Sequence, residues 1–506
     1  MATYLIYKDV VPDVESITTA TYTRANTTYS NVALILTGEP NDYASLDLNF
    51  WVSGQKRSWP NNTKMAFIND AVSDSNGVFT NTPVIRLDFS NGVTTAGITL
   101  DMTDGRAGEI NVKWYRDTYV IANETYYPDA DVYVVDRPTT DFTAVEISFI
   151  SSALPYGRLR VNNIVVGIER RLDMHVLQDV SIMNETDLSV TTLPISTLKW
   201  TVTARDASRY TYQSKQPVEA YHNTTLIGKY YLKTSERRSE RTYYVECTDA
   251  IGLLDNEPYS GGIWPSVSAR ALTNTILSDL FPLHEIGTIA DKTLSGVILA
   301  GTKRTALQQI FLAWGVVPVT DRYDGITIRN LSTQSYYIGE DKTIPGVTVK
   351  MDNIVTEIRV TAHSYSQDAS GDVEINGTKY KDTKTVYTKV NPNATSLDQT
   401  NIVEITDATF INNANANDIL EQLYQYYLRR ANVSAQVVWR DDVWLADYIT
   451  QISGWNTGLL AYIEKMNYSL SNTILVKCES KSTGDVGVIV GDWFRSGEAR
   501  SGEINA

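Results

Sequence analysis

The sequence predicts a mainly β protein, with an N-terminal jelly-roll sandwich followed by two small antiparallel β-barrels that an α/β insert separates. Three observations predict this class. Short runs of alternating apolar and polar residues recur between turn residues throughout the first third of the chain. Helical periodicity is concentrated in a few later segments. Tyrosine, which favours strands, occurs 31 times in 506 residues.

A chain of 506 residues is too long to fold around one hydrophobic core. The changes in periodicity divide it into a jelly roll, a first barrel, an insert, a second barrel and a C-terminal tail or docking peptide. The predicted boundaries are 1–168, 169–262, 263–343, 344–480 and 481–506.

The first segment contains regularly spaced runs that are typical of a sandwich. They are Val32–Thr37, Leu46–Val52, Val84–Phe89, Ala96–Met102, Glu109–Tyr115 and Val132–Asp136. Its closing stretch, Asp141–Arg171, has two strand-like runs joined by a Pro-Tyr-Gly turn and then the strand-like "RVNNIVVG". This stretch resembles the end of galactose-binding-like jelly rolls.

In the middle of the chain, the periodicity of the apolar residues changes twice. Leu198–Asp206 alternates, and Gln216–Asp255 holds three strand-like runs, which together predict a small barrel. Ser268–Leu280 and Ala306–Trp314 then carry helical apolar stripes, and Gly315 ends the second stripe as a C-terminal cap. Two short strands follow within the insert, at Val316–Thr320 and Gly325–Arg329.

The second barrel is expected from about Val347. Ile354–Ala362 alternates, and Asn376-Gly377 predicts a hairpin turn. A helix is expected over Ala414–Arg430, and strands at Gln436–Trp439, Gly458–Ser469 and Thr473–Ser480 close the segment. The tail repeats Arg-Ser-Gly-Glu.

Composition narrows the functional classes. The chain has no apolar run long enough to span a bilayer and no signal-peptide pattern at its N-terminus. Cys247 and Cys478 lie in strand-like runs and are expected to be buried free thiols. Four scattered histidines leave little from which to build a metal site. A net charge of −15 argues against tight wrapping around nucleic acid, although it permits loose passage of DNA.

We expect no enzymatic activity and no cofactor. The sequence has no Gly-x-Ser-x-Gly elbow, no Walker loop and no His-Glu-x-x-His motif. Acidic clusters such as Asp101–Asp104 are explained by solvated turns, since 59 acidic residues will gather somewhere by chance. Asp129, Asp131 and Asp136 could ligate calcium, but strand-end turns explain them better.

One loop of the jelly roll suggests carbohydrate binding. Trp59 lies in the polar stretch "SGQKRSWPNN", beside Arg57, Asn61 and Asn62. An exposed Trp can stack on a sugar ring while neighbouring polar groups bond its hydroxyls. The alternative is that Trp59 packs under its own loop or against a neighbouring subunit.

The order of modules resembles that of the baseplate hub proteins of bacteriophage tails. The resemblance covers about residues 170–480 and rests on the domain order, on "GTKRTALQQIFLAWGVVPVTDRYDGITIR" and on "LEQLYQYYLRRANVSAQVVW". It implies a homotrimer whose six barrels form a ring that adapts a sixfold tail tube to a threefold spike. It also implies a location in the virion, assembly in the host cytoplasm and a part in the conduit for genome ejection.

The resemblance further implies partners: a tail tube or distal tail protein, a spike or tip protein, a tape measure protein and baseplate wedge proteins, with DNA only as transient cargo. We expect a neutral to acidic ring lumen, with the basic run Glu236–Arg241 facing outward. The alternative function is a carbohydrate-binding adhesin or receptor-binding tail protein that recognises a cell-surface glycan. A tail-associated enzyme that degrades the cell wall is a weaker third possibility.

Overall fold

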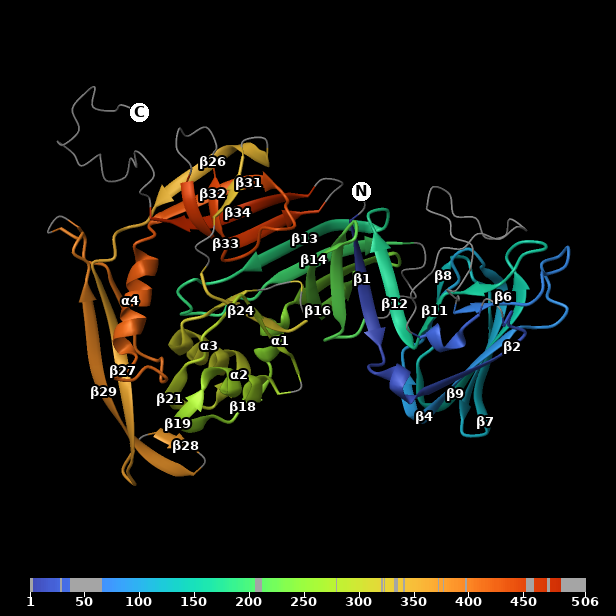
Figure 1. Cartoon of the computed structure of the whole chain (residues 1–506), viewed down its shortest axis with the longest axis horizontal. Coiled ribbons are helices and arrows are strands. Elements are labelled where there is room, and N and C mark those ends of the chain that lie inside the picture. Colours follow the sequence, from blue (N-terminus) through green and yellow to red (C-terminus); the bar gives the residue numbers. More distant parts are fainter. Residues whose placement is uncertain are drawn as a thin grey trace. The chain divides into compact units, whose positions relative to one another are not determined.

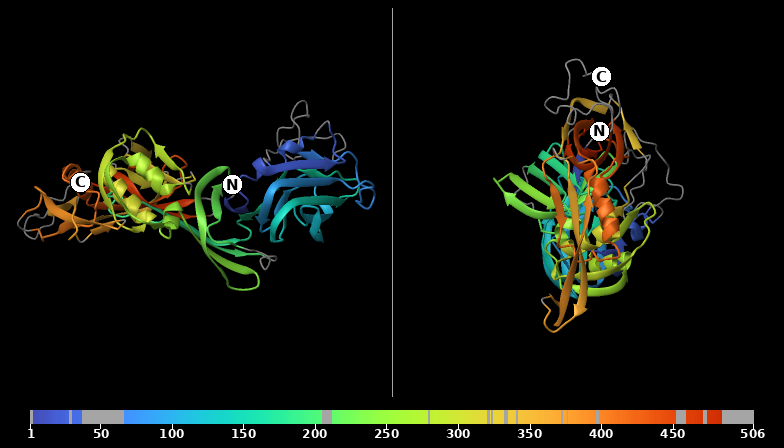
Figure 2. Two further views of the ribbon diagram at one scale, coloured as in Figure 1. Left: turned by 90° about the horizontal axis from the view of Figure 1, so that it is seen from below. Right: turned by 90° about the vertical axis from the view of Figure 1, so that its left-hand side faces the viewer.

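The computed structural model confirms a mainly β chain (Figures 1 and 2). It describes residues 3–27, 30–36, 66–204, 212–278, 280–319, 322, 324–331, 335–339, 342–371, 373–375, 377–395, 398–451, 459–470 and 474–483. The chain divides into two compact units, residues 6–171 and residues 1–5 with 172–506. Strands β1 (Thr3–Val10) and β12 (Gly167–Asp173) each include residues of both units.

The unit of residues 6–171 is built on antiparallel sheets that share one core. One sheet has the order β2 (Thr18–Thr23), β4 (Val84–Thr95), β9 (Thr139–Ser152), β6 (Ala107–Arg116) and β7 (Tyr119–Tyr126). A second has the order β11 (Asn163–Val165), β5 (Ile98–Asp101) and β8 (Val132–Val135), and β3 (Phe67–Ile68) pairs with β10 (Arg160–Val161). Short 3-10 turns cover Val14–Ile17 and Val32–Leu34. Trp114 and Phe142 pack edge to face in the common core, 4.8 Å between ring centres.

In the unit that contains residues 172–506, one long sheet runs through both β segments. Its strands follow the order β15, β16, β17, β14, β13, β33, β34, β31 and β26, and β32 pairs with both β33 and β25. Their bounds are β13 (Leu177–Glu185), β14 (Thr197–Thr203), β15 (Pro217–His222), β16 (Thr225–Arg237), β17 (Thr242–Thr248), β25 (Ser335–Ile338), β26 (Thr343–Met351), β31 (Ala431–Val438), β32 (Tyr448–Gln451), β33 (Leu459–Ser469) and β34 (Leu475–Ser482). We call β13–β17 the first β module and β25, β26 and β31–β34 the second β module.

This continuity departs from the expectation of two separate barrels. Residues Ser181–Glu185 of β13 pair antiparallel with Lys465–Ser469 of β33, so the two modules are joined edge to edge. The physical reason is that the edge of β13 opposite β14 carries backbone N–H and C=O groups that need partners. β33 supplies those partners from the far end of the chain.

A second departure concerns the segment expected to open the second barrel. Its strands form a sheet of their own, in the order β28 (Val373–Ile375), β29 (Thr378–Val390), β27 (Glu357–Gln367) and β30 (Ile402–Ile405). Helix α4 (Ala416–Tyr427) packs on β27 and β29 through a buried stripe, Ile419, Leu420 and Leu423. The predicted helix is therefore confirmed, but it covers this separate sheet.

The insert contains the helices expected from their stripes, α2 (Ala269–Leu277) and α3 (Lys303–Trp314). Gly315 ends α3 in the left-handed conformation, at φ 78°, as predicted. The strands are β18 (Pro258–Tyr259), β19 (Gly262–Ser268), β20 (Leu283–Ile286), β21 (Thr293–Ile298), β22 (Gly301–Thr302), β23 (Val317–Val319) and β24 (Ile326–Arg329), and the short helix α1 (Ala250–Leu254) precedes them. Pairing gives the orders β20-β24-β23, β19-β21 and β18-β22.

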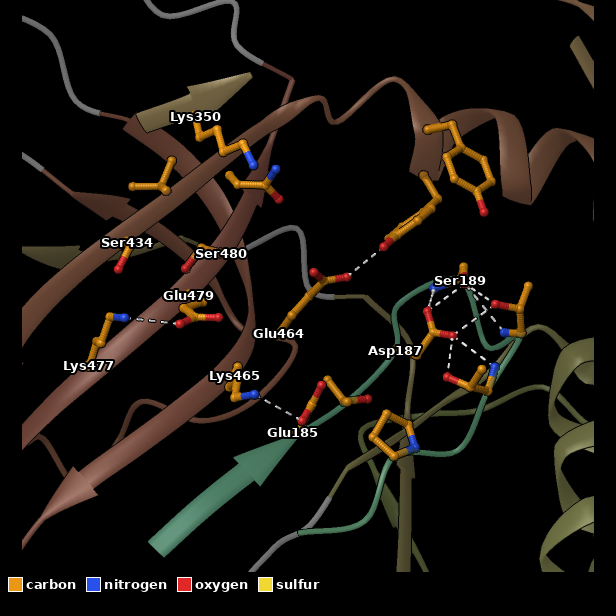
Figure 3. Close-up of a pocket in the computed structure, with 18 of the residues that line it drawn as sticks. Glu185, Asp187, Ser189, Lys350, Ser434, Glu464, Lys465, Lys477, Glu479 and Ser480 are labelled. Carbon is orange, nitrogen blue, oxygen red and sulfur yellow. Dashed lines mark hydrogen bonds and ion pairs between the residues drawn. The ribbon is translucent and has the colours of Figure 1, made fainter. Parts of the chain in front are cut away.

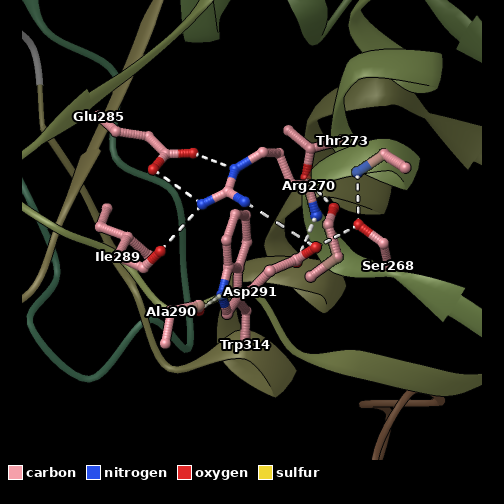
Figure 4. Close-up of polar contacts among 10 residues, drawn as sticks. Ser268, Arg270, Thr273, Glu285, Ile289, Ala290, Asp291 and Trp314 are labelled. Carbon is pink, nitrogen blue, oxygen red and sulfur yellow. Dashed lines mark hydrogen bonds and ion pairs between the residues drawn. The ribbon is translucent and has the colours of Figure 1, made fainter.

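A polar cluster fixes the insert's helices to its loops (Figure 4). Arg270 on α2 makes a bidentate pair with Glu285 on β20, at 2.5 and 3.0 Å, and donates to the carbonyl oxygen of Ile289 at 2.9 Å. Trp314 at the end of α3 donates its indole N–H to the carbonyl oxygen of Ala290 at 2.8 Å. Because Ile289 and Ala290 are neighbours, one loop anchors both helices.

Both cysteines are buried and free, as predicted. Burial raises the pKa of the Cys478 thiol to about 12 and also raises that of Cys247. Neither thiol is therefore reactive in the folded chain. Within the described ranges, no helix is long and apolar enough to cross a membrane.

Gly315→Ala should lower the free energy of unfolding by about 1 kcal/mol, because an L side chain is strained in the left-handed region. Gly315→Asn is the matched control and should cost less, since Asn tolerates this conformation better. Denaturant unfolding of the three proteins would measure the difference. Equal stabilities for the wild type and the Gly315→Ala variant would contradict this account of the α3 terminus.

Candidate functional site

The residues singled out for sugar and metal binding do not form a described site. Arg57, Trp59, Asn61 and Asn62 lie outside the described residues, so glycan binding there stays a prediction. Asp136 pairs with Arg170 at 3.2 Å, while Asp129 and Asp131 accept hydrogen bonds through their backbone carbonyls. Within the described part of the chain, no group of three His, Cys, Asp or Glu residues could hold a metal ion.

The feature that spans both β modules is a continuous polar sheet face. Residues directly opposite on paired strands share a face. The buried face carries rows such as Leu198–Cys247, Met466–Cys478 and Cys478–Ala435. The opposite face, which we call the polar face, carries Thr197, Lys199, Thr201, Glu246, Ser181, Met183, Glu185, Lys465, Asn467, Ser469, Lys477, Glu479, Lys481, Asn432, Ser434, Gln436, Thr348 and Lys350.

Three lysines of the polar face are paired with carboxylates, either on the neighbouring strand or two positions away on the same strand. Lys199 lies 3.6 Å from Glu246, Lys465 lies 3.3 Å from Glu185, and Lys477 lies 3.3 Å from Glu479. The Lys465–Glu185 pair crosses the junction of the two modules. Such partly exposed pairs contribute little stability. Their main consequence is a hydrophilic surface with nearly balanced charge.

The second module continues this pattern toward its edge. The Lys481 ammonium lies 2.7 Å from Asp352. Burial acts to raise the pKa of Asp352, but hydrogen bonds from Lys481 and Asn432 and the nearby charge of Lys350 lower it below its usual value. Asp352 is therefore a carboxylate at neutral pH, and it offsets the lysines at this end of the face.

A groove of about 690 Å³ lies where the two modules meet (Figure 3). Polar-face residues, including Lys350, Ser434 and Glu479, line one side. The loop after β13, from Thr186 to Pro194, and the tyrosines Tyr426 and Tyr427 of α4 line the other. The groove therefore brings together parts of the chain that lie far apart in sequence.

Glu464 of β33 is the most perturbed carboxyl of this groove. The Tyr426 hydroxyl donates to it at 3.0 Å. Burial raises the pKa of Glu464 to about 7, against the charge of Lys481 and the hydrogen bond from Tyr426, which lower it. The nearby Asp187 adds to the rise. Glu464 therefore changes its protonation state near neutral pH, at the junction of the modules.

Asp187 organises the loop that faces Glu464. Its carboxylate accepts from the backbone N–H groups of Ser189 and Thr192, both at 2.8 Å. The hydroxyls of Ser189, Thr191 and Thr192 also donate to it. From the insert, Gln308 of α3 donates to the carbonyl oxygens of Val190 and Thr191, at 3.0 and 3.1 Å. The loop thus links the insert to both modules.

Sequence reasoning missed both the polar face and Glu464. The alternation in Gly458–Ser469 predicts a strand, but burial of Glu464 depends on α4 and on the Asp187 loop, which come from other segments. The pattern Glu-Lys at positions 464 and 465 gives no sign that one side chain enters a groove and the other pairs across a module boundary.

No family model matches the sequence, and no curated protein matches it. Among solved structures, the chain is similar to the tail protein from Neisseria meningitidis MC58, with a TM-score of 0.47 and 13% identity, covering 63% of this chain and 94% of that one. It is also similar to the 43 kDa tail protein of prophage MuSo2 from Shewanella oneidensis, with a TM-score of 0.43 and 10% identity, covering 62% and 96% of the two chains.

A third similarity is to the family 32 CBM from C. perfringens NanJ, whose structure contains galactose. The TM-score is 0.20 and the identity 12%, covering 32% of this chain and 98% of that one. All three TM-scores lie below 0.5.

Glu464→Gln should stabilise the protein increasingly as the pH rises from about 5 to about 8. The folded pKa of about 7 lies above the ordinary value of 4.5, so the unfolded chain ionises first and the wild type loses stability across this window. The amide cannot ionise. The variant should gain up to about 3 kcal/mol at the alkaline end.

Denaturant unfolding at several pH values would test this, with Glu479→Gln as the control, because Glu479 is partly exposed and paired at the surface. A stability difference for Glu464→Gln that does not change with pH would contradict the assignment of a raised pKa.

Proposed function

We propose that this chain is a structural protein of a bacteriophage tail or a related injection particle, and that within it the chain is the hub of the baseplate. In this role, three copies adapt a sixfold tail tube to a threefold spike or tip. The observation that carries the proposal is the polar face, which continues without a break from the first β module into the second.

The joined modules suit the wall of a conduit. Each chain contributes two β modules that pair edge to edge, so three chains would contribute six around a ring. Closed rotational symmetry is the usual form of such homo-oligomers. The face of each module that is not buried in its own core would then be available to line the channel.

The charge pattern of the polar face suits the passage of DNA. A lysine that contacts phosphate releases counterions and holds the nucleic acid in place. Here the Lys199, Lys465 and Lys477 ammonium groups already have carboxylate partners within 3.6 Å. A polyanion moving along this face meets balanced charge, which favours sliding over retention.

The arginines of the β16–β17 hairpin are held by local contacts. Arg238 lies over the ring of Tyr244, 4.2 Å from its centre, and 3.6 Å from the Glu236 carboxylate. Arg237 donates to the carbonyl oxygen of Ser239 at 3.1 Å. Tyr244 lies opposite Thr201, so Arg238 stands on the side of the polar face. We propose that its pairing with Glu236 there keeps its charge from holding the cargo.

Light scattering on the purified chain should give three chain masses at micromolar concentration, and imaging of the particle should place it at the tail tip. The proposal requires self-association because one chain supplies only part of a ring. A stable monomer together with its absence from the tail tip would overturn the hub role.

Cysteine labelling tests whether the polar face is enclosed. Ser469 lies exposed on this face and Asn274 lies exposed on α2 of the insert, while both native cysteines are buried. In the trimer, a bulky polyethylene-glycol maleimide should label the Asn274→Cys variant but not the Ser469→Cys variant, while a small maleimide labels both. Equal labelling of the two variants by the bulky reagent would mean that the polar face is an outer surface.

A further inference from the structure

Strand β29 has an open edge on the side away from β27. It pairs with β27 from Tyr380 to Val390, whereas β28 covers only Thr378–Tyr380 on the other side. Within the described ranges, no strand pairs with the rest of that side. Figure 1 shows β27 and β29 as two long strands beside α4. Most of β29 is therefore paired on one side only within the described part of the chain.

The register shows which backbone groups lie on this open edge. His363 lies opposite Lys384, and the His363 N–H donates to the carbonyl oxygen of Ile411, away from β29. This is therefore a non-hydrogen-bonded pair, so the N–H and C=O of Lys384 point away from β27. The Asn391 N–H donates to the carbonyl oxygen of Thr356, toward the β27 side, which fits the same alternation. The open edge thus carries the N–H and C=O groups of Lys384, Val386, Thr388 and Val390.

The side chains at this edge combine apolar surface with a cation. Val386 is 59% exposed and Val390 is 65% exposed. Because alternate residues of a strand share a face, both valines stand on the same face as Lys384. An edge with unpaired backbone groups and apolar side chains is a template for another strand, and folded proteins usually cover or blunt it. A strand that covers this edge needs apolar residues opposite the two valines.

The strand is basic, although the chain as a whole is acidic. β29 carries four lysines, at positions 379, 381, 384 and 389, against one aspartate, while the net charge of the chain is −15. That aspartate, Asp382, lies 2.8 Å from the His363 Nδ1 atom and 3.9 Å from the Lys384 ammonium. The Lys384 side chain remains 61% exposed. A carboxylate on an added strand would therefore meet an accessible cation at Lys384, which favours cross-strand pairing.

A second copy of β29 is a poor occupant of this edge. Two such strands side by side would bring the four lysines of each into one sheet, and like charges on neighbouring strands destabilise their pairing. An acidic strand with apolar residues at alternate positions has no such cost. It supplies backbone partners for the edge, apolar contacts for the valines and carboxylates for the lysines.

We propose that the open edge of β29 is a docking site for an extended acidic segment of another protein, which adds to the sheet as an extra strand. Hydrogen bonds to the backbone of the edge would hold the segment in place. Val386 and Val390 would select apolar residues at alternate positions, and Lys384 would select a carboxylate. The inference does not depend on the hub role, because it uses only the contacts and charges of β29.

Hydrogen exchange on the purified full-length chain tests the proposal. The probe is the acetylated and amidated peptide Val-Thr-Thr-Thr-Val-Thr-Glu-Thr-Thr-Glu. Running antiparallel to β29, it places valines opposite Val386 and Val390 and glutamates opposite Lys384 and Lys381. At about 1 mM, the peptide should slow exchange at least about twofold at the edge amides, since a site with a Kd of about 1 mM is then half occupied. The same peptide with lysine in place of both glutamates should have no effect.

The chain provides matched controls for this experiment. The amides of Thr385, Tyr387 and Lys389 point toward β27 and should exchange equally with and without peptide. Val386→Pro removes one N–H from the edge without removing a bond to β27, and it should abolish the slowing at the other edge amides. Val386→Thr keeps the N–H and should respond like the wild type. Equal exchange in Tyr243–Thr248 would show that both variants are folded.

Three outcomes would overturn the proposal. Edge amides that the acidic peptide does not slow would mean that the edge accepts no such strand. Equal slowing by both peptides would mean that charge does not select the occupant. Edge amides that exchange as slowly as those of Thr385, Tyr387 and Lys389 without peptide would mean that the edge is already covered. The chain itself would be the cover if that protection survives dilution, and a second copy would be the cover if it does not.

Discussion

The pairing of β13 with β33 is the interaction on which the architecture of residues 172–506 depends. It joins strands whose side chains Glu185 and Lys465 are 280 positions apart, and it turns two β modules into one sheet. Closing so long a loop costs conformational entropy, although that cost grows only slowly with loop length. The junction is therefore reinforced where it forms, by the Asp187 loop and by the hydrogen bond between Tyr426 and Glu464. The raised pKa of the Glu464 carboxyl costs stability when the group is ionised, so the stability of the junction depends on pH near neutrality.

The ion pairs of residues 172–506 are of two kinds, buried and exposed. Arg329 of the insert and Asp447 of the second module form a buried pair at 2.8 Å, and removing either partner would leave an uncompensated charge in the interior. The lysine–carboxylate pairs of the polar face are accessible and individually contribute little to stability. Pairing there is better understood as a property of the surface, because it balances charge on a hydrophilic face.

Local sequence signals predict the helices, the Gly315 terminus, the buried thiols and the mainly β class, because each depends on neighbours within a few residues. The register between distant strands does not depend on near neighbours in the sequence. The alternation in Gly458–Ser469 therefore could not show that this strand pairs with β13. The same limit explains why the alternation over Ile354–Ala362 predicts a barrel strand, whereas the segment forms a separate sheet with β29 under α4. Asp136 is a candidate calcium ligand by sequence, but its actual partner, Arg170, lies 34 positions away. The proposed sugar-binding residues, Arg57 to Asn62, fall outside the described residues.

The insert contacts the first module, the second module and the separate sheet, which explains its place in the middle of the chain. Gln308 of α3 donates to the loop after β13, and Thr186 in that loop donates to the carbonyl oxygen of Pro318 in β23 at 2.6 Å. On the other side, Asn412 ahead of α4 donates to the carbonyl oxygen of Ser295 at 2.8 Å, and Arg329 reaches Asp447 in the second module. Helix α3 and strands β21, β23 and β24 of the insert thus brace the first module, the second module and the separate sheet. A strand pairing alone leaves two modules free to twist about their shared edge, and a brace that bonds to both sides removes that freedom. In a chain built mostly of strands, the compact α/β insert thus fixes the sheet at the point where it passes from one module to the next.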